Sequence, residues 1–118
     1  MISKNEAHAI IHSFAAAHAG TAFAMAQIPF ADTAALTAET ISMVSIIVAR
    51  CGNSWTQAAI ESFVAQQLAQ YAGVTAASEF SRFFPGFSNI FRACTSCAIT
   101  EAIGWATYEA CKVQSARN

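Results

Sequence analysis

Charged side chains are scarce in this chain of 118 residues. Six Lys or Arg and seven Asp or Glu amount to 11% of the sequence, less than half of the ~25% that is usual for globular proteins. The hydrophobic fraction is 55%, so the polar, highly charged composition of a disordered protein is excluded. A net charge of −1 provides no positive field for a phosphate backbone, which argues against nucleic-acid binding.

Glycine and proline are also few, with five and two residues. This excludes a collagen-like chain, and the lack of heptads with paired charges excludes a long coiled coil. No Asn-Gly or Asp-Gly turn and no sustained alternation of apolar and polar residues occurs, so β-strands are not expected. Alanine, with 27 residues, favours helix. We therefore predict a single all-α domain that spans residues 1–118.

Helix-capping residues and prolines divide the sequence into about five expected helices. We expect Ser3 or Asn5 to cap the first helix, Asp32 the second, Ser54 the third and Ser88 the last, because short polar side chains satisfy the free N–H groups of a first turn. The expected helices are about 5–27, 32–51, 54–72, 75–84 and 88–112. Pro29 and Pro85 mark two corners, which predict two helical hairpins, each built around a Pro corner.

The second and third expected helices differ in kind. The third is amphipathic, with an apolar face that should lie against the rest of the molecule. This face is formed by Ile60, Phe63, Val64, Leu68 and Tyr71, and the opposite face by Glu61, Ser62, Gln66 and Gln70. The second is apolar on nearly all sides apart from a thin seam of Asp32, Glu39 and Arg50, so it should be central in a core or lie in lipid.

Small residues recur at every fourth position in three places. These rows are Ala16, Gly20 and Ala24; Ala34, Ala38 and Ser42; and Ser96, Thr100 and Gly104. Such rows allow helix backbones to approach closely, in membrane bundles and in tightly packed soluble helices. We therefore predict tight, alanine-rich helix packing.

Residues 7–31 form a stretch without Asp, Glu, Lys or Arg, and they exceed the ~20 residues that a bilayer-crossing helix needs. Its histidines, its many alanines and Pro29 weigh against insertion. The four cysteines are too few for a disulfide-built protein, and they favour reduced thiols in the cytoplasm. We expect a cytoplasmic protein, with association at the inner membrane as a further possibility.

His8 and His12 are four residues apart, so both imidazoles should face the same side of a helix, as metal-binding pairs do. Ala9 follows His8, and the His-Glu-x-x-His motif of zinc hydrolases is therefore missing. A second set of possible ligands comprises Cys94, Cys97 and Cys111. Purely structural roles, as surface histidines and as inert buried thiols, are favoured over metal binding.

Glu101 shares an apolar stripe with Cys97, Trp105 and Tyr108, so its carboxylate should seek a partner. We expect this partner to be a cation or a hydroxyl, with Arg50 or Arg92 as the candidate cation, and the contact should hold helices together. A catalytic carboxylate pair of Glu39 and Glu101 is the less favoured alternative.

Aromatic residues gather around the second Pro corner. They are Phe80, Phe83, Phe84, Phe87 and Phe91. The cluster predicts either a plug that closes the corner or an exposed patch that docks a partner or a bilayer surface.

The first Pro corner and the helix after it resemble a known family. The residues that carry the resemblance are the run 26–44, then 47–52, and in the second half Phe84-Pro85-Gly86 and 100–104. They resemble the small hydrophobic helical domain of unknown function found C-terminal to some bacterial GTPase domains. The chain departs from that setting because it carries neither a GTPase domain nor a phosphate-binding Gly-Lys-Ser/Thr loop. The resemblance implies a stand-alone module that associates with itself, with a membrane or with a separately encoded GTPase.

The leading hypothesis is therefore a non-enzymatic helical module without a cofactor, which forms a homo-oligomer, binds a membrane, or does both, as an accessory to a bacterial GTPase system. The alternative is a helical bundle that binds a small molecule or a metal through His8 and His12 or through the cysteines Cys94, Cys97 and Cys111.

Overall fold

The structure, a computed structural model, describes residues 2–24, 31–71 and 87–117, with side-chain positions for 2–23, 35–71 and 93–116. The described residues form four helices and no strand, which confirms the all-α prediction. The helices are α1 (Lys4–Ala24), α2 (Ala31–Arg50), α3 (Gln57–Ala69) and α5 (Phe87–Arg117). The expected helix 75–84 and both Pro corners lie outside the described residues.

Local capping explains where α1 begins. Ser3 Oγ accepts a hydrogen bond from the backbone N–H of Glu6 at 3.1 Å, so Ser3 rather than Asn5 is the cap. Glu6 lies in the first turn, where a negative charge opposes the positive end of the helix dipole.

A left-handed glycine ends α2. Gly52 has a φ of +79°, and the backbone N–H groups of Gly52 and Asn53 donate to the carbonyls of Ala49 and Val48. This is the Schellman arrangement that commonly closes a helix, and it confirms the predicted end near Cys51. Asp32, the predicted cap, lies instead within the first turn, because the helix already includes Ala31.

The cap of α3 is Thr56, not the predicted Ser54. Its side-chain oxygen accepts from the N–H of Ala59 at 3.1 Å, and its backbone is extended. The predicted amphipathic character is confirmed, because Ile60 and Val64 are buried whereas the residues of the expected polar face are exposed. The last helix, α5, begins one residue before the predicted start and continues to Arg117.

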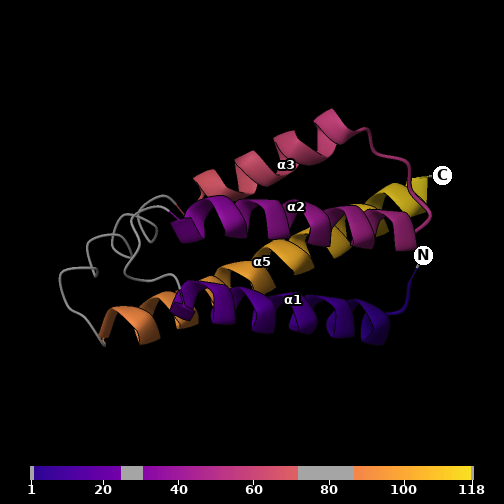
Figure 1. Cartoon of the computed structure of the whole chain (residues 1–118). Coiled ribbons are helices and arrows are strands. Elements are labelled where there is room, and N and C mark those ends of the chain that lie inside the picture. Colours follow the sequence, from indigo (N-terminus) through magenta and orange to yellow (C-terminus); the bar gives the residue numbers. More distant parts are fainter. Residues whose placement is uncertain (1, 25–30, 72–86, 118) are drawn as a thin grey trace.

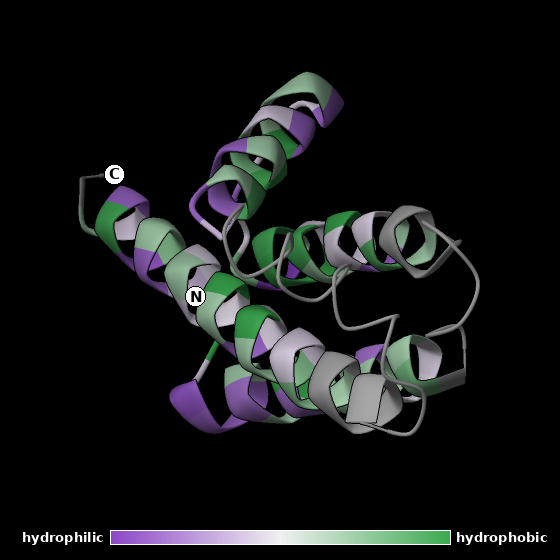
Figure 2. Ribbon diagram, turned by 90° about the vertical axis from the view of Figure 1, so that its left-hand side faces the viewer, coloured by the Kyte–Doolittle hydropathy of each residue, from purple (hydrophilic) through white to green (hydrophobic). Residues whose placement is uncertain are grey.

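Three helices form the body of the molecule, and α3 packs on α2 (Figure 1). Contacts between Glu6 and Arg50 at one end and between Thr21 and Glu39 at the other show that α1 and α2 run antiparallel. In Figure 2, hydrophilic residues, drawn in purple, lie along α3 at the top of the view and at the first turn of α1 at the lower left. The second helix, α2, contacts α1, α3 and α5, as expected of a central helix. The exposure of Ile46, which is 40%, shows that one side of α2 is nevertheless uncovered.

The helices α1 and α5 approach each other closely at Gly104. A Cβ atom built there would lie 2.6 Å from Ile11 Cγ1 and within 3.0 Å of two further Ile11 carbons. Ile11 is fully buried, and its branched side chain has few alternative rotamers. The row of Ser96, Thr100 and Gly104 therefore serves close packing inside this chain.

No helix within the described parts of the chain is both long and apolar enough to cross a membrane.

Two glycine substitutions test the close approach. Gly104→Ala should destabilise the fold by about 1–2 kcal/mol, because overpacking against Ile11 outweighs the gain in helix propensity. Gly20→Ala is the matched control, since nothing lies within 4 Å of a Cβ built at that helical position. It should stabilise by up to ~1 kcal/mol. Urea denaturation followed by circular dichroism measures both, and equal effects would contradict the packing.

Candidate functional site

A buried histidine occupies the inner face of α1. The inner face consists of Ala7, Ile11, Ala15, His18 and Ala22, all buried. His18 is 1% exposed, and the ring of Phe14 lies edge-on to it with centroids 6.0 Å apart. A polar ring at such a position requires partners, because burial of an unpaired polar group is costly.

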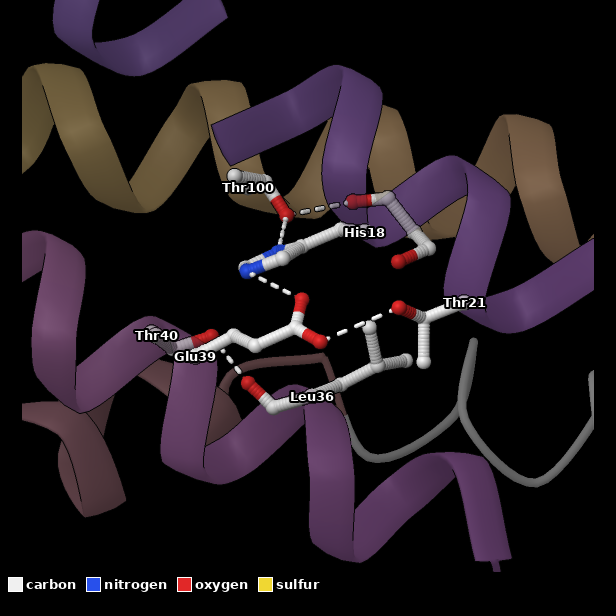
Figure 3. A network of polar contacts seen from close by, with 7 residues as sticks. His18, Thr21, Leu36, Glu39, Thr40 and Thr100 are labelled. Atoms are coloured by element: carbon white, nitrogen blue, oxygen red, sulfur yellow. Dashed lines mark hydrogen bonds and ion pairs between the residues drawn. The ribbon is translucent and has the colours of Figure 1, made fainter. Parts of the chain in front are cut away.

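Two other helices supply those partners (Figure 3). Nδ1 of His18 contacts Thr100 Oγ1 on α5, and Nε2 lies 3.2 Å from Glu39 Oε2 on α2. The latter contact is not aligned as a hydrogen bond, so it is chiefly a charge–dipole or charge–charge attraction. Glu39 is oriented by Thr21, whose hydroxyl donates to Oε1 at 3.0 Å. We call His18, Glu39 and Thr100 the histidine layer.

The proton count of the histidine layer leaves one hydroxyl hydrogen to be shared. Thr100 Oγ1 lies 2.8 Å from the carbonyl oxygen of Ser96 and also contacts His18 Nδ1. Nε2 faces a carboxylate and is therefore the nitrogen that carries hydrogen in the neutral ring. The Thr100 hydroxyl, which donates to the Ser96 carbonyl oxygen, then shares its hydrogen with Nδ1. When Nδ1 is protonated, it donates to Thr100, which in turn donates to Ser96.

Burial lowers the pKa of His18 from its ordinary value of 6.5, and the Glu39 carboxylate opposes this shift. Desolvation is the larger cause, because a charged imidazolium loses its hydration in the core. The ring is therefore neutral at pH 7.

The order hydroxyl, imidazole, carboxylate is also that of nucleophilic hydrolases. A nucleophile must reach a substrate, whereas Thr100 is 2% exposed and His18 is 1% exposed. In this arrangement the histidine layer joins three helices, and its chemistry is structural.

His8 and His12 lie on an outer flank of α1. Their ring centroids are 3.9 Å apart, which confirms that they face the same side. Nδ1 of His12 contacts Glu101 Oε1 on α5, and the ring of Trp105 lies 6.1 Å from that of His8. Within the described residues, no group of three His, Cys, Asp or Glu side chains has an arrangement that could hold a metal ion.

Of the two arginines predicted as partners of Glu101, Arg50 pairs with another carboxylate in the structure. Glu101 contacts His12, whereas Arg50 pairs with Glu6, with its Nη1 3.1 Å from Oε1. The side chain of Arg92 lies outside the described residues. Glu39 and Glu101 contact different histidines, so no contact brings the alternative catalytic pair together.

The alternative ligand set of Cys94, Cys97 and Cys111 is not assembled either. All three belong to the unbroken helix α5, whose rise of ~1.5 Å per residue holds Cys97 about 21 Å from Cys111. Cys111 instead contacts Cys51, which follows α2. Of the predicted aromatic patch, Phe80, Phe83 and Phe84 lie outside the described residues, as do the side chains of Phe87 and Phe91.

The sequence carried a signal for His18 that we did not use. It lies three residues after Ala15 and four before Ala22 on the inner face, a spacing that predicts burial. Its partners could not be predicted, because they come from helices that meet it only in the folded chain.

No protein-family model, curated protein or solved structure matches this chain.

Paired threonine substitutions test the histidine layer. Thr100→Val removes the hydroxyl that contacts His18 Nδ1 and should destabilise the fold by about 1–3 kcal/mol. Thr107→Val on the same helix is the matched control, because the equally buried Thr107 hydroxyl donates only to Ile103 of its own helix. It should remain within about 1 kcal/mol of the wild type. Equal losses in urea denaturation would contradict a role of Thr100 between helices.

The lowered pKa of His18 predicts a pH dependence. In the unfolded chain the pKa returns to 6.5, so the unfolded state binds a proton more readily than the folded state. The contribution of His18 to the free energy of unfolding is therefore fully present above pH 6.5 and declines as the pH falls toward the lowered pKa. His18→Gln should flatten the profile of unfolding free energy between about pH 7.5 and 5. His8→Gln, which removes an exposed ring, is the control, and an unchanged profile for His18→Gln would refute this assignment.

Proposed function

We propose that this chain is a non-enzymatic helical module that works by pairing with a second copy of itself through the outer faces of α1 and α2. On the basis of the resemblance to GTPase-associated domains, we further propose that the paired module is an accessory to a bacterial GTPase system. The observation that carries the proposal is an exposed face of small, uncharged residues that extends over two neighbouring helices.

On α1 this face has regular spacing. Ala9, Ser13, Ala16 and Gly20 are exposed and follow one another at intervals of four, three and four residues, which is the repeat of a seam between two packed helices. The hydroxyl of Ser13 donates to the carbonyl of Ala9 at 2.8 Å. Because its hydrogen bond is made within the helix, the seam remains effectively apolar.

The face continues on α2 with Ala38, Ser42, Ile46 and Ala49, which are also exposed. Ile46 lies between Glu39 and Arg50 in the sequence, on the flank of α2 where these two residues contact α1. The outer faces of the two helices are therefore adjacent. None of the eight residues that form this face is ionisable.

A second copy of the chain suits this face for three reasons. Small side chains allow two backbones to approach closely, and an antiparallel pairing centred near Ala16 would set Gly20 of one copy near Ser13 of the other without opposing like charges. The dipoles of antiparallel helices also attract each other. A lipid surface suits it less, because interfacial helices use bulky Trp, Phe and Leu flanked by Lys and Arg.

The size of the face sets the expected strength of pairing. Two helices, each ~10 Å wide and ~20 Å long, present about 400 Å² per copy, which is below the ~800 Å² per partner of a standard interface. We therefore expect a weak dimer whose population increases with protein concentration.

Charged substitutions on the outer faces test the proposal. Ala16→Glu sets two carboxylates against each other at the centre of the pairing and should shift the mass measured by light scattering to that of the monomer. Ser42→Glu on α2 should act in the same direction. Ala65→Glu on the exposed side of α3 is the matched control and should leave the dimer intact.

The thermal transition of each variant verifies that it is folded, since all three sites are exposed. A mass of Ala16→Glu equal to that of the wild type would contradict the proposal. Binding of the wild type to anionic phospholipid vesicles, lost in Ala16→Glu, would assign the face to lipid and would also contradict it.

A further inference from the structure

Two buried thiols meet where α2 ends against α5. Cys51 is the residue between the last turn of α2 and Gly52, and the closing turn described above fixes its backbone. It is 3% exposed, and Cys111 on α5 is fully buried. Both belong to the same hydrophobic core and both are free thiols, and the Cys51 thiol lies close enough to Cys111 to contribute to raising its pKa.

Neighbouring contacts hold the two thiols in place. The side-chain amide of Asn53 donates to the carbonyl oxygen of Cys111 at 3.4 Å. Trp55 Nε1 donates to Gln114 Oε1 at 2.7 Å. The segment after α2 is thus attached to α5 at Cys111 and at Gln114, next to the thiol pair.

We propose that Cys51 and Cys111 are a redox modification site, which closes to an intramolecular disulfide on reaction with a low-molecular-weight disulfide such as oxidised glutathione. A thiolate of one cysteine attacks the reagent, whose S–S bond breaks, and one glutathione leaves as a thiolate that takes up a proton. The second cysteine then attacks the protein-side sulfur of the mixed disulfide and releases the other glutathione. Two protein thiols are oxidised, and one glutathione disulfide is reduced to two thiols.

The closed bundle protects the pair. Burial, together with the neighbouring Cys51 thiol, raises the pKa of Cys111 to about 12, so the reactive thiolate is rare. Reaction therefore requires this end of the bundle to open. The first turn of α1 and the last turn of α5 both lie at this end (Figure 1), and the terminal turns of helices fray most readily. The other two cysteines do not compete for Cys111, because Cys97 is about 21 Å away along α5.

The disulfide would join residues that are sixty positions apart in the sequence. Such a cross-link restricts the unfolded chain strongly, and it would join α2 to α5 at a place where the folded chain already brings them into contact. Oxidation would thus convert an end that frays into one that stays closed.

The test uses the full chain with Cys94→Ser and Cys97→Ser, so that only the proposed pair remains. After prolonged incubation with oxidised glutathione at mildly alkaline pH, the intact mass should fall by two hydrogen atoms. Proteolysis without reductant should release a linked peptide that contains both cysteines. The melting temperature should increase by at least about 5 °C and return to its original value with dithiothreitol.

A third substitution, Cys51→Ser in the same background, is the matched control, and it should show neither the mass loss nor the increase in melting temperature. Stable glutathione adducts on the two-cysteine protein, or an unmodified mass, would overturn the proposal. Peptide mapping of the oxidised wild type gives the same decision if the background substitutions impair folding, because a Cys51–Cys111 link supports the proposal and any other link refutes it.

Discussion

Close approach of the helix backbones is the constraint on which this structure depends. Alanine supplies much of the apolar surface, and its single methyl group fills little space, so water is excluded only when helices lie near each other. The contact of Gly104 with Ile11 shows the result, because even one added carbon would collide there. A core built in this way has little tolerance for added volume.

Packing of small residues alone does not select one register, because an alanine face slides easily along another. The histidine layer supplies the missing selection. One imidazole reaches Thr100 on α5 and Glu39 on α2, and a shift of any of the three helices by one turn would separate it from at least one of these two side chains. Single buried polar residues are known to fix register in helical assemblies in this way. The lowered pKa of His18 reflects the burial of its ring.

Local chemistry made several parts of the fold predictable. Ser3 and Gly52 fix helix ends through bonds to backbone groups within a few residues, and the polar and apolar faces of α3 follow from helical spacing. Both Ser54 and Thr56 are suitable cap residues, so the sequence alone does not decide between them. The path of the backbone makes Thr56 the cap. The contact of Glu101 with His12 was not predicted, since it depends on how α1 lies along α5.

The contact between Cys51 and Cys111 was equally invisible in the sequence, where sixty positions separate them. It follows from a parallel arrangement of α2 and α5, which the antiparallel placement of α1 against both imposes. The candidate sites that could be predicted were those within one helix, such as His8 and His12. Those that join helices required the fold.

The same shortage of bulk and charge that shapes the interior also characterises the outer faces of α1 and α2, which are small, uncharged and exposed. We propose that a second copy covers them. Sedimentation equilibrium of the unmodified chain in detergent-free buffer tests this claim most directly. The account predicts an apparent mass that increases with concentration from 12.5 kDa toward twice that value. A mass that remains at 12.5 kDa up to about millimolar concentration, where even a weak pairing would be populated, would contradict it.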